Sequence, residues 1–367
     1  MDLMSRFSFG INLDDPWRYA GLMAPKSIII PHLLSASLPE GMLIDKVDDL
    51  IIREHGDVEP KTQAARATLA LAESLADAKV DFVRCWFPWR YFEPRLVAEG
   101  QIDDLLQESY ESWPLDDFVN RLTEHGIGLV PVLACGYQRM LPDALDVDRT
   151  QGTYLRRAAV HARLLVKRYR DRIRHWQIEN EPNWWKQHEG AGWRHGVSWL
   201  DPHDFKAELL KVLNLAVHDE DPSAKTIINL EGDTGLAGAS AYAAYCDILG
   251  VDFYPNYRSS SPIQTSVFRQ ADELAKECEK PVLISETGYP SGPLLLGYTQ
   301  SKQAEYVRAA CEQAYALRGV NAVGIWRYAD TAWKSFPDQE NHFGLIDSKG
   351  TPKSGWAAFK ETIGRLR

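Results

Sequence analysis

Short runs of apolar and β-branched residues alternate along the chain with longer stretches whose apolar positions recur at helical spacing. The short runs predict strands and the longer stretches predict helices. The predicted strands are residues 7–13, 81–89, 127–136, 174–182, 225–232, 250–257, 281–290 and 321–330. The predicted helices are residues 62–80, 115–126, 152–173, 201–221, 239–249, 266–280, 301–319 and 354–366.

The regular order of these elements predicts the fold class. Each predicted strand is followed by a helix, an order typical of parallel sheets. Repetition of this unit favours a closed (β/α)8 TIM barrel, and no glycine-rich phosphate loop follows any strand. We expect a single α/β barrel domain over residues 1–367. Residues 14–60 interrupt the alternation, and we expect them to form a long insertion between the first strand and the first helix, near the barrel mouth.

The charge balance argues against a polyanionic partner. The chain has 51 acidic and 41 basic residues, a formal net charge of -10, and the charges are interspersed along the sequence. It lacks the basic cluster that binds nucleic acid or an anionic membrane surface, so we expect neither partner.

The N-terminal residues lack the pattern of a signal peptide, and no run approaches the roughly 18 apolar residues of a membrane span. We therefore expect cytoplasmic residence; an exported protein whose leader had been removed would look the same. The five cysteines include no C-x-x-C pair, which predicts reduced thiols instead of disulfides or a zinc site. We expect no metal and no organic cofactor.

Two predicted strands end in a glutamate. The fourth ends in NEP with Glu181, and the seventh ends in SETG with Glu286. In such barrels the C-terminal ends of the strands form the active site, so both carboxylates are expected at one mouth. A retaining glycosidase needs two carboxyl groups about 5–5.5 Å apart, one as a protonated acid and one as a nucleophile. A structural interpretation, in which each glutamate caps the following helix, stays open.

In these two strand ends and in three further residues, the sequence resembles clan A of the glycoside hydrolases. The residues that carry the resemblance are NEP at 180–182, ISETG at 284–288, Arg84 ending the second strand, Tyr254 after the sixth and Trp326 ending the eighth. The resemblance covers the chain except residues 14–60. It implies a (β/α)8 barrel that cleaves β-glycosidic bonds with retention of configuration and without a metal or cofactor.

At the matching positions the resemblance implies individual roles. Glu181 would be the general acid/base and Glu286 the nucleophile, while Asn180 would bind the sugar 2-hydroxyl. Arg84 and Tyr254 would donate hydrogen bonds to Glu286, keeping it ionised and oriented. The structural alternatives are that Arg84 only neutralises a buried acid and that Tyr254 only packs.

Aromatic residues are the expected walls of the sugar site. The chain has 12 Trp and 15 Tyr, and flat aromatic faces pack against the C–H face of sugar rings. The resemblance makes Trp326 the stacking floor at the cleaved position. Trp185, in the tryptophan-rich segment 183–199, and Trp86 and Trp333, beside the second and eighth strands, are further candidates for substrate binding. For each of them, packing in the core or within a loop is the alternative.

Glu179 precedes the candidate site by two residues and shares a strand face with Glu181 if side chains alternate strictly. A buried carboxylate requires a partner. We therefore expect Glu179 to be buried and paired with Arg84 or another inward-facing basic group.

The favoured function is hydrolysis of a β-linked oligosaccharide or glycoside by double displacement through a covalent glycosyl–Glu286 intermediate. A transglycosylase would use the same two glutamates with a sugar as acceptor, and a non-catalytic carbohydrate-binding barrel would bind without turnover. A barrel aldolase is disfavoured because no lysine ends an inner strand. The sugar, the linkage, exo or endo action and the oligomeric state are not specified by the sequence.

Overall fold

The computed structural model describes residues 5–13, 60–87, 89–93, 113, 115–136, 152–183, 205–233, 235–331 and 338–367. The expected insertion at 14–60 lies outside the described residues except for residue 60, which begins a helix.

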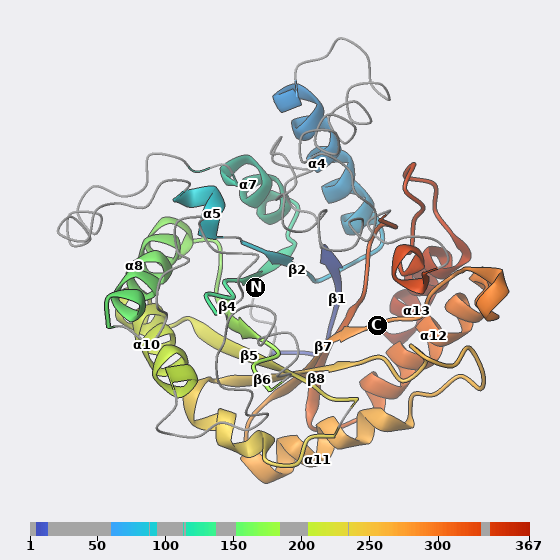
Figure 1. Ribbon diagram of the computed structural model, residues 1–367. Coiled ribbons are helices and arrows are strands. Elements are labelled where there is room, and N and C mark those ends of the chain that lie inside the picture. Colours follow the sequence, from blue (N-terminus) through green and yellow to red (C-terminus); the bar gives the residue numbers. More distant parts are fainter. Residues whose placement is uncertain are drawn as a thin grey trace, which may run out of the picture.

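Eight parallel strands form a closed barrel in chain order, and β1 pairs with β8 to complete it (Figure 1). The predicted (β/α)8 TIM barrel is therefore confirmed. The strands are β1 (Ser8–Leu13), β2 (Phe82–Trp86), β3 (Gly128–Val132), β4 (His175–Asn180), β5 (Lys225–Glu231), β6 (Ile248–Phe253), β7 (Val282–Thr287) and β8 (Val320–Ile325).

Helices surround the strands on the outside of the barrel (Figure 1). Their buried residues recur at intervals of three and four, as along Ala304, Val307 and Cys311, which directs one face toward the sheet. The α-helices are α4 (Pro60–Asp77), α5 (Trp89–Phe92), α7 (Asp116–Glu124), α8 (Gly152–Tyr169), α10 (Phe205–Glu220), α11 (Arg269–Cys278), α12 (Gln300–Ala316) and α13 (Ser354–Leu366). The 3-10 helices are η3 (Ala239–Tyr245), η4 (Ser266–Phe268), η5 (Leu294–Leu296) and η6 (Gln339–His342).

The predicted helix at 239–249 was wrong in type and extent. The segment forms only the 3-10 helix η3, and β6 already begins at Ile248. Ile248 and Leu249 pair with Ile227 and Ile228 of β5, so pairing within the barrel overrides the local helical pattern. A short apolar run fits either element, and its neighbours in the fold decide between them.

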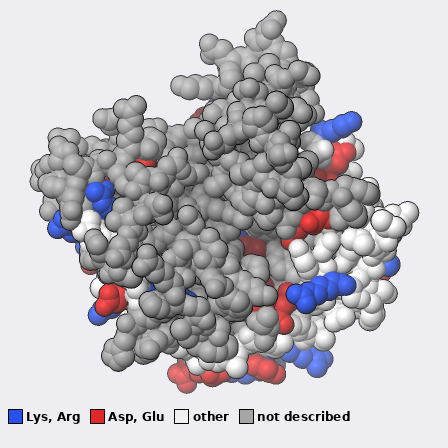
Figure 2. All heavy atoms as spheres, viewed as in Figure 1, with Lys and Arg blue, Asp and Glu red and all other residues white. Residues whose placement is uncertain are grey.

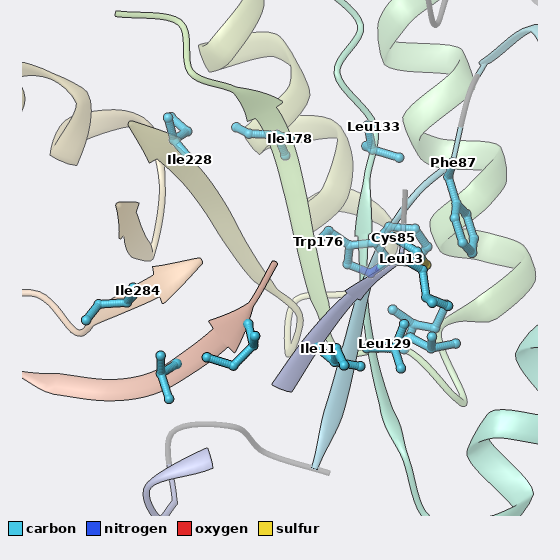
Figure 3. Close-up of a cluster of buried hydrophobic side chains, with 14 of the residues drawn as sticks. Ile11, Leu13, Cys85, Phe87, Leu129, Leu133, Trp176, Ile178, Ile228 and Ile284 are labelled. Carbon is cyan, nitrogen blue, oxygen red and sulfur yellow. The ribbon is translucent and has the colours of Figure 1, made fainter. Parts of the chain in front are cut away.

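The main apolar core lies between the strands and the helices. It includes the buried strand residues Ile11, Cys85, Leu129, Trp176 and Ile228, which Figure 3 shows in one cluster. These residues alternate with side chains that face the barrel interior.

Inside the barrel, an apolar layer lies toward the N-terminal ends of the strands. Its members are Phe82, Val130, Ile227, Ile248, Leu283 and Ala322. Gly10 belongs to the same interior face, and a Cβ there would lie 2.2 Å from the Phe82 ring. Because inward positions recur every second residue, Arg84, Asn229 and Asp252 also face the interior, nearer the C-terminal ends. The apolar layer is thus the floor beneath a polar layer.

The described surface carries charges of both signs. Figure 2 shows Lys and Arg side chains lying among Asp and Glu on one face. Several form ion pairs, such as Arg121 with Asp117 at 2.8 Å and Arg163 with Asp219 at 2.5 Å. In the described part of the chain, no helix is long and apolar enough to cross a membrane.

Candidate active site

Arg84 lies at the centre of the polar layer. It occupies the middle of β2, not its end as the sequence suggested, because β2 continues to Trp86. Its Nε donates to Gln177 Oε1 at 2.6 Å, and its Nη2 donates to Asn180 Oδ1 at 2.8 Å. Its Nη1 donates to Asn12 Oδ1 at 2.8 Å and to Glu286 Oε1. Acceptors on β1, β4 and β7 therefore fix the guanidinium in one orientation.

Glu286 accepts hydrogen bonds on both carboxyl oxygens. Oε1 accepts from Arg84, and Oε2 accepts from the Tyr254 hydroxyl at 2.5 Å. Burial, followed by the charge of Glu286, raises the pKa of Tyr254 well above its ordinary value, so the phenol remains a donor. The Arg84 guanidinium and the Tyr254 phenol thus each donate to one oxygen of Glu286, which fixes the orientation of its carboxylate.

Glu181 follows β4 directly and lies in a different environment. Its φ is 43°, in the left-handed region that non-glycine residues rarely adopt. Its backbone N–H donates to Asn229 O at 3.0 Å, and the residue is only 8% exposed. Burial, then the charges of Glu286 and Glu231, raises the pKa of Glu181 well above its ordinary value. Glu181 therefore holds its proton to a higher pH than a typical glutamate does.

A bulge in β4 sets the directions of the side chains before Glu181. The register with β5 shifts between Gln177 and Glu179, which breaks strict alternation. As a result the Asn180 side chain reaches the interior, where its Oδ1 also accepts from Gln177 Nε2 at 3.2 Å.

Glu179 is buried, as expected, but of the two partners expected for it, Arg84 was wrong, and pairing with another inward-facing basic group stays a prediction. Its oxygens accept from the backbone N–H groups of Gly136 at 2.7 Å and Asn180 at 2.9 Å. The guanidinium of Arg84 is already directed to other acceptors, among them Glu286. Backbone donors after β3 and at the end of β4 thus bind the carboxylate in place of that guanidinium.

Sequence reasoning missed Asp252. It lies near the end of β6, is 1% exposed, and accepts a hydrogen bond from Asn229 Nδ2. Hydrogen bonding between its carboxyl group and that of Glu181 raises the pKa of Asp252 and lowers the pKa of Glu181. Its signal in the sequence was its position two residues before Tyr254, which puts both on one strand face.

No protein-family model matches the chain, and no curated protein matches it significantly. Solved structures match it at low identity. A GH5_18 protein from Bifidobacterium longum in complex with Manβ1-4GlcNAc has a TM-score of 0.66 at 15% identity, over 98% of this chain and 78% of its own. A GH5_18 protein from Streptomyces cattleya in complex with GlcNAc has a TM-score of 0.67 at 16% identity, over 99% and 80%.

A GH2 β-galacturonidase from Eisenbergiella tayi bound to galacturonate also matches, with a TM-score of 0.57 at 15% identity. The match covers 82% of this chain and 48% of the galacturonidase chain. The chain has the fold of the clan A glycoside hydrolases. At this identity the likeness concerns the barrel, and the chemistry of the site is argued from the residues themselves.

In this barrel, two of the candidate aromatic residues border the polar layer. Trp86 ends β2, packs against Val132 and Ala134, and has the Arg84 guanidinium 5.9 Å from its ring centroid. Trp326 directly follows β8 and is half-buried, and its backbone N–H donates to Thr287 O at 2.8 Å. The candidates Trp185 and Trp333 lie outside the described residues.

Among the described residues, no group of three or more His, Cys, Asp and Glu side chains has an arrangement that could hold a metal ion. The described polar layer instead contains carboxyl groups, amides and one guanidinium, linked by hydrogen bonds. Such a set can orient a hydroxylated substrate, donate a proton and supply a carboxylate nucleophile.

Proposed function

We propose that the chain is a retaining β-glycosidase, with Glu286 as nucleophile and Glu181 as general acid/base. The observation that carries the proposal is the contrast between the two glutamates at one end of the barrel. Glu286 is held by a guanidinium and a phenol, whereas burial beside that negative charge raises the pKa of Glu181. Two carboxyl groups whose environments separate their protonation are the pair that glycosidic cleavage requires.

In the first half of the reaction, a Glu286 oxygen bonds to the anomeric carbon as the bond from that carbon to the glycosidic oxygen breaks. The Glu181 proton passes to the departing oxygen, which leaves as an alcohol. In the second half, Glu181 takes a proton from water, the water oxygen bonds to the anomeric carbon, and the Glu286 ester bond breaks. Two inversions give net retention of configuration.

The neighbouring residues support these steps by position. Arg84 and Tyr254 donate to Glu286 and would stabilise it again when the ester breaks. The Asn180 oxygen accepts from Arg84, so the amide nitrogen is the group that would donate to a sugar 2-hydroxyl. Trp326 would supply the aromatic surface beneath the sugar.

For the substrate, we propose a short β-linked oligosaccharide with a neutral glycone. Glu231 and Glu286 contribute negative charge near Glu181, and the described cation beside them, Arg84, is already bound to Glu286. A uronate in the same position would meet like charge. The Manβ1-4GlcNAc in the Bifidobacterium longum protein makes β-mannosides the first series to test.

Product analysis tests the proposal. The wild-type chain is incubated with nitrophenyl β-glycosides and β-linked disaccharides, and proton NMR follows the first sugar released. We expect the β-anomer first. In Glu181→Ala with an activated aryl glycoside, added azide should yield a β-glycosyl azide, whereas in Glu286→Ala it should yield the α-glycosyl azide. Release of the α-anomer by the wild type, or full turnover by Glu286→Ala, would contradict the proposal.

Transglycosylation remains a second outcome of the same chemistry. Products longer than the substrate at high acceptor concentration would favour it. Binding by calorimetry without any turnover would favour the non-catalytic carbohydrate-binding barrel.

A further inference from the structure

A directional chain of hydrogen bonds crosses the barrel and ends at Asp252. Arg84 has only donors, so the group that accepts from its Nε is the oxygen of Gln177. The amide nitrogen of Gln177 must then be the donor edge, and it donates to Asn229 Oδ1 and to Asn180 Oδ1. The backbone N–H of Glu181 donates to the same oxygen at 3.2 Å.

Because its oxygen accepts these bonds, the nitrogen of the Asn229 amide faces Asp252 and donates to Oδ2. This leaves Asp252 Oδ1, which is buried and has no N–H or hydroxyl donor among the described groups. The Glu181 carboxyl is the neighbouring acid, and hydrogen bonding between the two carboxyl groups raises the pKa of Asp252 and lowers that of Glu181. A hydrogen bond between two carboxyl groups requires a proton on one of them.

The surrounding charges favour a neutral Asp252. Negative charge reaches it from Glu286 on β7 and from Glu181 after β4, while the Tyr254 phenol, which follows its own strand, is uncharged. Arg84 is the facing cation and it pairs directly with Glu286. Burial and the Glu286 charge raise the pKa of Asp252 well above its ordinary value. Ionising all of these carboxyl groups against one guanidinium would leave buried charge without a partner.

We propose that Asp252 is a positioning residue that stays protonated through the reaction and donates a hydrogen bond from Oδ1 to the Glu181 carboxylate formed when the leaving group takes its proton. This inference rests on the proposed function of Glu181 as acid/base. Asp252 gives no proton to the substrate. It stabilises the conjugate base of the acid, and so strengthens that acid in the first half of the reaction.

The test compares Asp252→Asn with Asp252→Ala. An asparagine keeps an oxygen for Asn229 and presents an N–H to Glu181, so it replaces a neutral carboxylic acid with a neutral donor. We expect the basic limb of the kcat/KM profile of Asp252→Asn to stay within a few tenths of a pH unit of wild type. If Asp252 were ionised, removal of its negative charge would move that limb to lower pH by about one unit or more.

In Asp252→Ala the donor is lost. We expect the basic limb to move to higher pH, and kcat/KM for a poor leaving group to fall about 10- to 100-fold, because a buried carboxylate would lack its donor. A dinitrophenyl glycoside, which needs little proton donation, should lose much less. An equal loss for both leaving groups at all pH values would indicate a merely structural role and overturn the proposal. Asp221→Asn, at a buried carboxyl bonded to Arg174 and Ser223, is the matched control and should keep the wild-type profile.

A second measurement does not depend on turnover or on the alanine variant folding. Infrared difference spectra over a pH titration should show a protonated carboxyl band in the wild type that persists above the basic limb and is absent from Asp252→Asn. Loss of that band at the pH of an ordinary aspartate would overturn the proposal. If the wild type cleaves no β-glycoside, the proposed function fails, and the infrared result still decides whether Asp252 keeps its proton.

Discussion

At position 181 a glutamate has a φ of 43° and a side chain enclosed beside other carboxyl groups. Such strain persists only where the surrounding structure imposes it, and it is concentrated at functional sites. Here the NEP segment, the bulge in β4 and the backbone bond to Asn229 impose it. The environment opposes ionisation of Glu181. Its effect on the free energy of unfolding is therefore expected to depend on pH.

Replacement of Glu181 by Gln should therefore change stability in a pH-dependent way. The folded-state pKa of Glu181 is raised by burial and by Glu286, whereas the unfolded chain ionises near about 4.3. Between these values the folded state binds more protons, so the stability of the wild type falls as pH rises through this window. We expect Glu181→Gln to match the wild type in acid, apart from a constant offset, and to gain relative Tm as pH rises. Calorimetric melting over the pH range measures this, and an offset that never changes with pH would contradict it.

Arg84 is expected to be irreplaceable by lysine. A lysine ammonium cannot bind Gln177, Asn180 and Glu286 simultaneously with the fixed fork of a guanidinium. We expect Arg84→Lys to lower kcat/KM about 10²- to 10³-fold, the scale of losing one oriented donor in a site. The matched control Arg163→Lys, at an exposed pair with Asp219, should leave kcat/KM unchanged. Equal activity of the two variants would show that the guanidinium geometry is unimportant.

At this scale, some of the site could be predicted from the sequence and some could not. Glu181, Glu286, Arg84 and Tyr254 were found from motifs at strand ends, and the structure brings them together. Asp252 was missed because it lies in an apolar strand, and its significance comes from groups on β4 and β5 that only the folded barrel brings near.

The elements differ in how well local pattern predicts them. Long amphipathic helices such as α12 and α13 agree with their predicted positions within a few residues, because their apolar faces repeat over several turns. The helix predicted at 239–249 was wrong because the last residues of the segment are stabilised more by pairing in β6 than by continuing a helix. The bulge in β4 has no local signal, since it depends on register with β5.

Two glycines differ in the space that an added methyl group would have, one inside the barrel and one on a helix. Gly10 on β1 gives room to the Phe82 ring, whereas Gly364 in α13 has open space where a Cβ would lie. We expect Gly10→Ala to lower the free energy of unfolding by about 1–3 kcal/mol through overpacking. Gly364→Ala should raise it by about 0.5–1 kcal/mol, because alanine favours the helix. Denaturant unfolding measures both, and a Gly10→Ala protein as stable as the wild type would contradict the packing of the barrel floor.

For the whole molecule, the site exists only when the barrel closes. Its polar residues come from β1, β2, β4, β5, β6 and β7, and Asn12 on β1 also donates to Ser285 O on β7 at 3.0 Å. The alternation of strands and helices predicted this closure, because each unit adds one parallel strand. It did not predict which inward side chains meet, since bulges at β4, β6 and β7 set that.

The most direct test of the central claim is covalent trapping of the nucleophile. The wild-type chain is incubated with activated 2-deoxy-2-fluoro β-glycosides of the mannose and glucose series, which slow release of a glycosyl enzyme. Intact mass and peptide mapping then locate the label. We predict one glycosyl group per chain, attached to the peptide at Glu286, and none in Glu286→Gln. Stoichiometric labelling at another carboxylate, with Glu286 unmodified, would contradict the proposal.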